Sequence, residues 1–148
     1  MVSISIKLIL FTFLMALAAA CGLQPKASSV TNVCRNADRS SVLVEGYLRL
    51  PISTDVVVRE PVKTEDHVLI IVENVNGAGA FVSTSVSTTK TNEPNKMAVL
   101  PTSYTYNDLH IYTNSGKQIT TDERVSITGH ITKESTTCVI EVNKIETP

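Results

Sequence analysis

Hydrophobic and polar residues alternate one by one along much of the chain after residue 40. A period of two is typical of β-strands, because successive side chains of a strand point to opposite faces of the sheet. Residues 41–51 (SVLVEGYLRLP) show this pattern clearly. The apolar side chains of the segment share one face and the remaining side chains share the other: Val42, Val44, Leu48 and Leu50 against Glu45, Tyr47 and Arg49. The pattern predicts a half-buried strand.

Similar patterns predict further strands downstream. Residues 67–74 (HVLIIVEN) are apolar on nearly both faces, which is typical of a central strand. Residues 80–88 alternate, with a Ser- and Thr-rich face that we expect to be solvated. The segments 109–113, 124–134 and 136–146 complete the set of predicted strands.

The segments between the strands carry loop signals, and glycines interrupt two strands. Asn114-Ser115-Gly116-Lys117 is a turn signal, whereas residues 97–107 are expected to be extended or irregular. Gly46 and Gly129 each lie in the middle of a predicted strand. Glycine at such a position indicates a bulge or a sharp bend. We find no convincing helix after residue 20.

Five or six strands, two of them with a central glycine, predict an all-β domain built as a small antiparallel barrel. The stretches VLVEGYLRLP, LHIYTNSGKQITTDERVSITGHI and CVIEVNKIE, in this order, resemble the OB-fold arrangement. The resemblance covers roughly residues 40–146 and implies an OB-like barrel of five or six strands. Residues 75–107 form a longer segment than a plain OB-fold requires. The alternative fold is a β-sandwich, although an immunoglobulin-like sandwich would be expected to carry a tryptophan and the chain has none.

The N-terminal residues have the composition of an export signal. Residues 1–7 (MVSISIK) carry a single basic side chain, Lys7, and residues 8–20 (LILFTFLMALAAA) carry no charge. The apolar run has the length of a signal-peptide core and is short for a membrane-spanning helix, which needs about 20 apolar residues. We therefore predict a helical signal peptide over residues 1–20.

The end of this segment, LMALAAACG, resembles the lipobox of bacterial lipoproteins. The resemblance implies cleavage after Ala20 and attachment of diacylglycerol to the thiol of Cys21, with a further acyl chain such as palmitate on the new amino terminus. The match is incomplete, because Ala18 stands where the family prefers Leu. Ordinary secretion with the same cleavage site is the alternative, since Ala18-Ala19-Ala20 also satisfies the small-x-small rule.

The resemblance to a lipobox implies a cellular location and a division of the chain into segments. Gly22, with no Asp after the cysteine, is compatible by resemblance with sorting to the periplasmic face of the outer membrane. The alternative is that the protein is soluble and is either periplasmic or secreted. Residues 21–33 are expected to form a lipidated cysteine and a flexible tether, and residues 34–148 the barrel domain.

The chain contains three cysteines, and an odd number in an exported protein leaves one over. If Cys21 carries lipid, Cys34 and Cys138 remain to form a disulfide in an oxidising compartment. That bridge would close a loop of about 100 residues and contribute roughly 4 to 5 kcal/mol on the chain-entropy model. Two unpaired buried thiols are the alternative.

Charge limits the classes of partner. The formal net charge is -1, and removal of Lys7 with the leader leaves 12 basic against 14 acidic residues, or -2. A surface of this kind disfavours nucleic acid as a partner, because phosphate recognition usually requires a basic face. It also indicates that membrane attachment comes from the lipid anchor and not from the domain's field.

No residue pattern identifies a catalytic centre, a metal site or a cofactor. His67, His110 and His130 lack ligand partners at close spacing, and neither Cys34 nor Cys138 has one. The acidic pairs Glu65-Asp66 and Asp122-Glu123 are expected to be solvated turn residues. The candidates for a ligand-stacking surface are the tyrosines of the C-terminal half: Tyr104, Tyr106 and Tyr112.

These observations lead to three hypotheses of function. The first is a lipid-anchored cell-envelope protein with a non-catalytic binding or assembly domain, whose partner is another envelope protein or a glycan. The second is an OB-type binder of an oligosaccharide or single-stranded nucleic acid, which requires the three tyrosines to be exposed on one surface. The third is an acid-base hydrolase, which requires two carboxylates that face one cleft.

Overall fold

The computed structural model describes residues 24–51, 57–58, 66–101, 103–134 and 137–148. The predicted signal peptide and Cys21 lie outside these residues. The described residues form eleven strands: β1 (Lys26–Ser28), β2 (Ser41–Arg49), β3 (Val57–Val58), β4 (Asp66–Val72), β5 (Phe81–Thr89), β6 (Met97–Ala98), β7 (Ser103–Tyr104), β8 (Ile111–Tyr112), β9 (Gln118–Ile119), β10 (Val125–Glu134) and β11 (Thr137–Glu146). Two short 3₁₀ helices, η2 (Val33–Arg35) and η3 (Tyr106–Asp108), complete the described elements.

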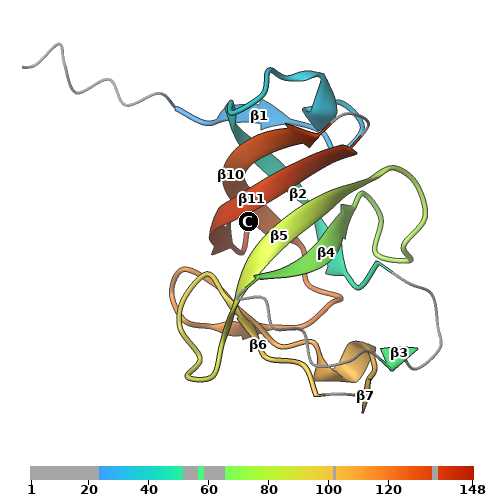
Figure 1. Cartoon of the computed structure of the whole chain (residues 1–148), viewed down its shortest axis with the longest axis vertical. Helices are drawn as coiled ribbons and strands as arrows, with labels where there is room; N and C mark the ends of the chain where they lie inside the picture. Colours follow the sequence, from blue (N-terminus) through green and yellow to red (C-terminus); the bar gives the residue numbers. More distant parts are fainter. Residues whose placement is uncertain (1–23, 52–56, 59–65, 102, 135–136) are drawn as a thin grey trace, which may run out of the picture.

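The five long strands close into a barrel (Figure 1). Around the barrel each strand pairs with the next in the order β2, β4, β5, β11, β10 and back to β2. Only the pair β5 and β11 is parallel, and the other four pairs are antiparallel. A closed five-stranded Greek-key barrel with this connectivity is OB-like. The prediction of an all-β, OB-like barrel is therefore confirmed.

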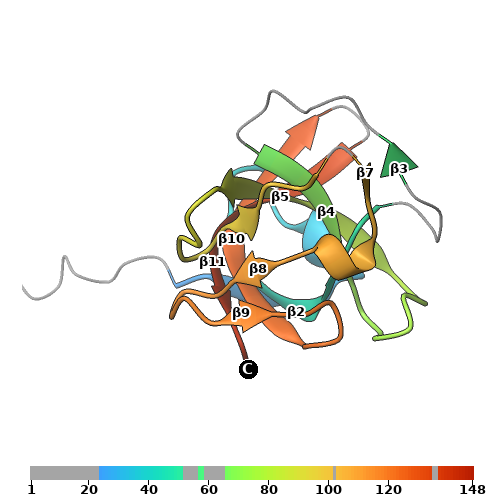
Figure 2. The same cartoon turned by 90° about the horizontal axis from the view of Figure 1, so that it is seen from below.

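Extra strands extend the barrel at two places. β1 adds to β2 in parallel, with Lys26 opposite Val42. β6, β8 and β9 form a small extension that begins at the C-terminal end of β5. Figure 2, seen from below, shows β8 and β9 lying across this end of the barrel. The extension uses the long segment after β5 that a plain OB-fold does not need.

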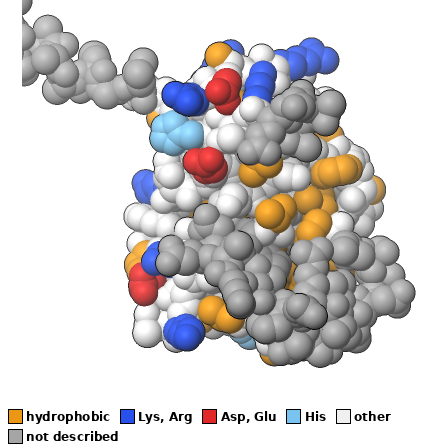
Figure 3. Space-filling model, viewed as in Figure 1, with side chains coloured by type: hydrophobic (Ala, Val, Ile, Leu, Met, Phe, Trp, Pro, Cys, Tyr) orange, Lys and Arg blue, Asp and Glu red, His pale blue; other side chains and the backbone are white. Residues whose placement is uncertain are grey.

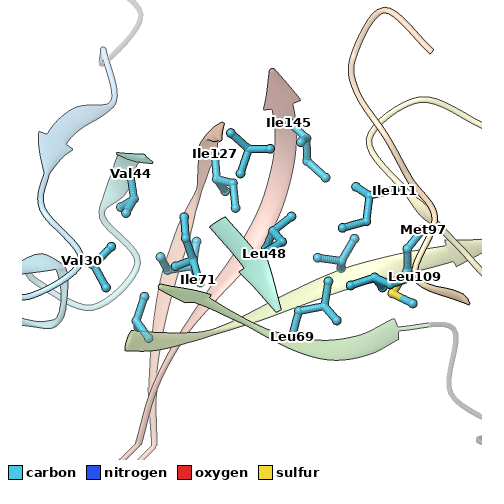
Figure 4. Packing of buried hydrophobic residues seen from close by; sticks show 14 of the residues in the cluster. Val30, Val44, Leu48, Leu69, Ile71, Met97, Leu109, Ile111, Ile127 and Ile145 are labelled. Atoms are coloured by element: carbon cyan, nitrogen blue, oxygen red, sulfur yellow. The ribbon is translucent and has the colours of Figure 1, made fainter. Parts of the chain in front are cut away.

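The alternation of the sequence places one face of every barrel strand inside. In β2 the buried positions are those of the predicted apolar face together with Gly46. Figure 4 shows side chains from the barrel strands meeting in the interior, with Met97, Leu109 and Ile111 continuing the core to one side. Burial of apolar surface at about 25 cal/mol per Å² is the main term that holds such a barrel together.

Both mid-strand glycines allow close approach between strands. A Cβ at Gly46 would collide with the carbonyl oxygen of Val72 and lie 2.7 Å from the Ile71 side chain. A Cβ at Gly129 would collide with the carbonyl oxygen of Glu141. The pairing of β10 with β11 shifts register between Thr128 and Gly129, so the predicted bulge is confirmed at this glycine. Glycine is required at both positions because any side chain would separate the strands.

The N-terminal boundary of the domain differs from the expectation. Residues 26–28 form a strand, and Val30 and Val33 are buried in the core. The prediction of a flexible tether over residues 21–33 is therefore wrong for residues 26–33. A three-residue strand with the sequence Lys-Ala-Ser is too short and too polar to show alternation, which is why its pattern did not reveal it.

The disulfide predicted from the cysteine count is present. Cys34 in η2 is bonded to Cys138 near the start of β11, with their Cα atoms 5.8 Å apart and a sequence separation of 104. The bridge fastens the N-terminal segment to the last barrel strand. Both cysteines are partly buried and pack against the hydrophobic core.

Candidate functional site

An open groove of about 520 Å³ lies beside β4, the second strand of the barrel. Its floor is apolar and comes from Leu50, Ile70 and Val72. Its rim is formed by the β4–β5 turn, by η3 and by the loop that precedes β10. We call this hollow the Arg49 groove, because Arg49 lies at the point where these segments meet.

Arg49 joins the loops around the groove. Its guanidinium donates hydrogen bonds to the backbone carbonyl oxygens of Thr121 and Val75, and it forms an ion pair with Asp122 at 3.2 Å. The Arg49 side chain is only 12% exposed, whereas that of Asp122 is 79% exposed. Hydrogen bonds between a charged donor and carbonyl oxygens are stronger than neutral ones. Arg49 therefore connects the two loops that border the groove.

The β4–β5 turn is built to hold its side of the rim. The side-chain amide of Asn74 donates to the carbonyl oxygen of Ala78 at 3.0 Å, and the backbone N–H of Ala78 donates to Asn76 Oδ1 at 3.0 Å. Gly77 and Gly79 have positive φ angles of 77° and 99°. Glycine suits both positions because it has no Cβ. The turn keeps Asn76 at the rim of the groove.

The opposite rim is set by the capped helix η3. Thr105 Oγ1 accepts from the N–H of Asn107, and the Asp108 carboxylate accepts from the N–H of Thr105 at 2.7 Å. This capping box satisfies the backbone groups at the start of the helix. The hydrogen bond from the Thr105 backbone, with a second bond from its hydroxyl, lowers the pKa of Asp108 below its ordinary value. The cap fixes Tyr106 and Asn107 at the groove.

An exposed apolar strip continues from the groove over the outer face of β4 and β5. Val68 is 49% exposed and Phe81 is 66% exposed, both unusually high values for large hydrophobic residues. Between them, Ile70 is half-buried and also lines the groove. Figure 3 shows hydrophobic side chains gathered on this face of the molecule. In OB-folds the face of the second and third strands is the surface that binds ligands.

The three predicted stacking tyrosines do not form one surface. Tyr104 and Tyr112 are each only 6% exposed, and both are core positions. The expectation of an exposed platform made of Tyr104, Tyr106 and Tyr112 is therefore wrong. Tyr106 alone reaches the Arg49 groove, where it is half-buried. The spacing of the three tyrosines in the sequence follows no regular period. It therefore could not show which of the rings are buried.

The acidic pair before β10 is divided between two cations. Asp122 pairs with Arg49, and Glu123 pairs with Lys117 at 2.7 Å and accepts from the N–H of Thr120. The hydrogen bond from Lys117 and that from the Thr120 backbone lower the pKa of Glu123. These contacts agree with the expectation of solvated turn residues. Glu65 and the side chain of Asp66 lie outside the described residues.

Two carboxylates do line one hollow, at a different place. Glu45 and Glu73 face a shallow depression of about 390 Å³ beside β1. Glu45 is paired there with Arg124 at 3.2 Å. The hydrolase hypothesis requires two carboxylates that face one cleft, and Glu45 and Glu73 meet this requirement only in that they line the same shallow depression. The hypothesis stays a prediction.

The histidines are engaged with amide side chains. His110 Nδ1 is 2.8 Å from Gln118 Nε2, and His130 Nδ1 is 2.8 Å from Asn143 Nδ2. Both residues are exposed. The side chain of His67 lies outside the described residues. Within the described part of the chain, no group of three or more His, Cys, Asp or Glu residues is placed to hold a metal ion.

The sequence did not single out most of the groove residues. Arg49 is one polar position on an amphipathic strand, and its loop partners are 26 and 72 residues distant in sequence. Asn76-Gly77 was recognisable only as a turn signal. No local sequence pattern reveals the groove, because Arg49 contacts its loop partners only in the folded barrel.

At the level of sequence, the chain matches no protein-family model and no curated protein. Among solved structures it is similar to the hypothetical protein ygiW from E. coli, at 14% sequence identity and a TM-score of 0.46. The match covers 83% of this chain and 90% of that one. The OB-like assignment of the barrel rests on its own strand pairing. In the described residues, no helix has the length and apolar character needed to cross a membrane.

Proposed function

We propose that the protein is an exported lipoprotein of the bacterial cell envelope, whose barrel is a non-catalytic binding module. The observation that carries the proposal is the Cys34–Cys138 disulfide. Disulfides persist in oxidising compartments outside the cytosol, so the bond supports export. It also uses two of the three cysteines and leaves Cys21 of the lipobox-like segment as the remaining thiol.

Lipidation of Cys21 accounts for that remaining thiol. An unpaired cysteine at the amino terminus of an exported protein would be open to oxidation or to intermolecular pairing. A thioether to diacylglycerol removes this reactivity, and more than one acyl chain gives stable anchoring to a bilayer. We place the protein at the periplasmic face of the outer membrane, with a soluble periplasmic or secreted protein as the alternative.

The Arg49 groove is the proposed ligand site, and its chemistry favours a glycan. Tyr106 offers part of an aromatic ring, and Asn76 and Asn107 offer amides that both donate and accept hydrogen bonds. Sugar hydroxyls need donors and acceptors of this kind. Nucleic acid is a poor fit, because Asp122 is exposed at the rim and the guanidinium of Arg49 already bonds to the protein.

Co-sedimentation with purified peptidoglycan sacculi tests the glycan assignment. The mature protein should sediment with the sacculi, and the double substitution Tyr106→Ala with Asn107→Ala should reduce the bound fraction several-fold. A matched control is Gln118→Ala, a change of an exposed residue on β9 outside the groove. Equal binding by the groove variant and the control, or no binding by any form, would contradict a glycan in this groove.

A further inference from the structure

The end of the barrel that carries the disulfide also carries a cluster of basic side chains. Arg35 follows Cys34, which is bonded to Cys138, and Cys138 lies opposite Lys133 in the β10–β11 ladder. Arg39 is fixed at the same end, because its backbone N–H donates to the carbonyl oxygen of Ile131 at 2.8 Å. We call Lys26, Arg35, Arg39 and Lys133 the basic end. Figure 3 shows Lys and Arg side chains gathered at the top of the molecule, where β1 lies in Figure 1.

The basic end is exposed and only partly neutralised. All four residues are exposed, and the Arg39 side chain is 92% exposed. Among the described residues, Lys26, Arg35 and Lys133 take part in no ion pair, and Arg39 makes a long one of 3.9 Å with Asp38. Asp38 is also engaged by the backbone N–H of Lys133 at 2.9 Å.

The local charge therefore differs in sign from that of the whole chain. Four basic residues stand against Asp38, Glu134, whose side chain lies outside the described residues, and Glu141, which accepts a hydrogen bond from Thr132, so the formal local charge is 4 − 3 = +1. The mature chain as a whole carries 12 − 14 = -2. A protein with such an asymmetry is attracted to an anionic surface through one end and repelled through the rest.

The lipidation site lies close to this end in the chain. Cys21 is five residues before Lys26, the first residue of β1. An extended chain spans about 3.3 to 3.6 Å per residue, so Lys26 can be no more than about 18 Å from an anchored Cys21. Because residues 26–33 are packed on the barrel, no long tether separates the domain from the bilayer.

We propose that the basic end rests on the anionic phospholipid surface of the membrane and orients the barrel. This inference rests on the proposed lipid anchoring of Cys21. Phosphate head groups are the ligand, and each Lys or Arg held near an anionic bilayer contributes about a five-fold preference at low salt. The opposite end of the barrel, with β6, β8 and β9, then points away from the membrane.

Tryptophan fluorescence can test this orientation, since the chain has no tryptophan of its own. The lipidated protein is prepared as two single-tryptophan forms, Ala37→Trp at the basic end and Val99→Trp beside β6, both at exposed positions. Each is reconstituted into vesicles of phosphatidylcholine and phosphatidylglycerol that contain a lipid with a nitroxide on its head group. Ala37→Trp should be quenched several-fold more strongly than Val99→Trp, and high salt or vesicles without phosphatidylglycerol should reduce the difference.

Charge reversal provides the second arm. Arg35→Glu with Lys133→Glu should weaken the oriented state on the order of a hundred-fold and abolish the selective quenching of Ala37→Trp. Lys90→Glu with Lys144→Glu changes the net charge equally and should leave it intact. The inference is overturned if Ala37→Trp and Val99→Trp are quenched alike, or if phosphatidylglycerol has no effect. An occupant other than lipid, such as an acidic protein segment, would give that second result. If the wild-type protein fails to float with the vesicles at all, the proposed lipid anchoring fails as well.

Discussion

Gly129 of β10 lies against the carbonyl oxygen of Glu141 on β11, at a distance that leaves no room for a side chain. The contact coincides with the register shift between Thr128 and Gly129, where β10 bends around the barrel. Gly46 of β2 lies equally close to the carbonyl oxygen of Val72 on β4. Closure of the small barrel depends on these two approaches.

Substitution of either glycine is expected to destabilise the barrel. Gly129→Ala and Gly46→Ala should each lower the free energy of unfolding by about 2 kcal/mol or more, because backbone on the neighbouring strand must move to admit a methyl group. Urea unfolding measured by circular dichroism provides the value. Ser126→Ala, on the same strand and half-buried, is the matched control and should change stability little. A Gly129→Ala variant as stable as the control would show that the strands do not pack this closely.

Removal of the disulfide should have a large effect. The Cys34→Ser, Cys138→Ser variant is expected to lose roughly 4 kcal/mol of unfolding free energy, since the bridge constrains a loop of 104 residues in the unfolded chain. The urea midpoint of the wild-type domain should also fall when a reductant is added, and that of the variant should not. Equal midpoints for the oxidised protein and the variant would mean that the bond adds nothing to stability.

The hydroxyl of Thr84 is expected to lower the free energy of unfolding. Thr84 is fully buried in β5, and its Oγ1 has no hydrogen-bond partner among the described residues. Thr84→Val keeps the shape and removes the unsatisfied group, so it should raise the unfolding free energy by about 1 kcal/mol. Thr128→Val, at a half-buried position of β10, is the control and should be near neutral. Destabilisation by Thr84→Val would indicate that the hydroxyl has a partner in solution.

Low pH should destabilise the protein through the loops that contain Glu93 and Glu123. Hydrogen bonds from Lys96 and Lys117, the largest causes, hold the pKa of Glu93 and of Glu123 below the ordinary value of 4.5. A carboxyl group with a lowered folded-state pKa stabilises the protein at pH above its unfolded pKa, and this stabilisation is lost as pH falls through the folded pKa. The melting temperature should therefore decline below about pH 4.5, and less steeply in Glu123→Gln than in the wild type. Identical slopes for the two proteins would contradict a role for Glu123.

The alternation of residues such as Val44 and Leu48 was sufficient to predict the strands, because burial on one face leaves a period of two in the sequence. The odd count of cysteines, together with the lipobox resemblance around Cys21, led to the prediction of the bridge between Cys34 and Cys138. Two features could not be read in this way. β1 is held by pairing with β2 and by the disulfide, and neither constraint leaves a local pattern. The Arg49 groove is assembled from three loops that only the closed barrel brings together.

The difference between Tyr106 and its neighbours has a similar origin. Tyr104 and Tyr112 belong to the short strands β7 and β8 and are buried, whereas Tyr106 begins the capped helix η3 at the groove. Tyr104 and Tyr106 have equally polar neighbours in sequence, although one ring is buried and the other is half-buried. Their exposure is decided by the path of the chain between β6 and β9, which depends on tertiary packing.

The most direct test of the central proposal is the intact mass of the mature chain isolated from bacterial membranes. The account predicts a protein that begins at Cys21, carries the added mass of diacylglycerol and a further acyl chain, and is two hydrogens lighter because of the Cys34–Cys138 bond. Cys21→Ser should abolish the added mass and release the protein from the membrane fraction. A membrane-associated or soluble wild-type chain that begins at an unmodified Cys21 would contradict the account.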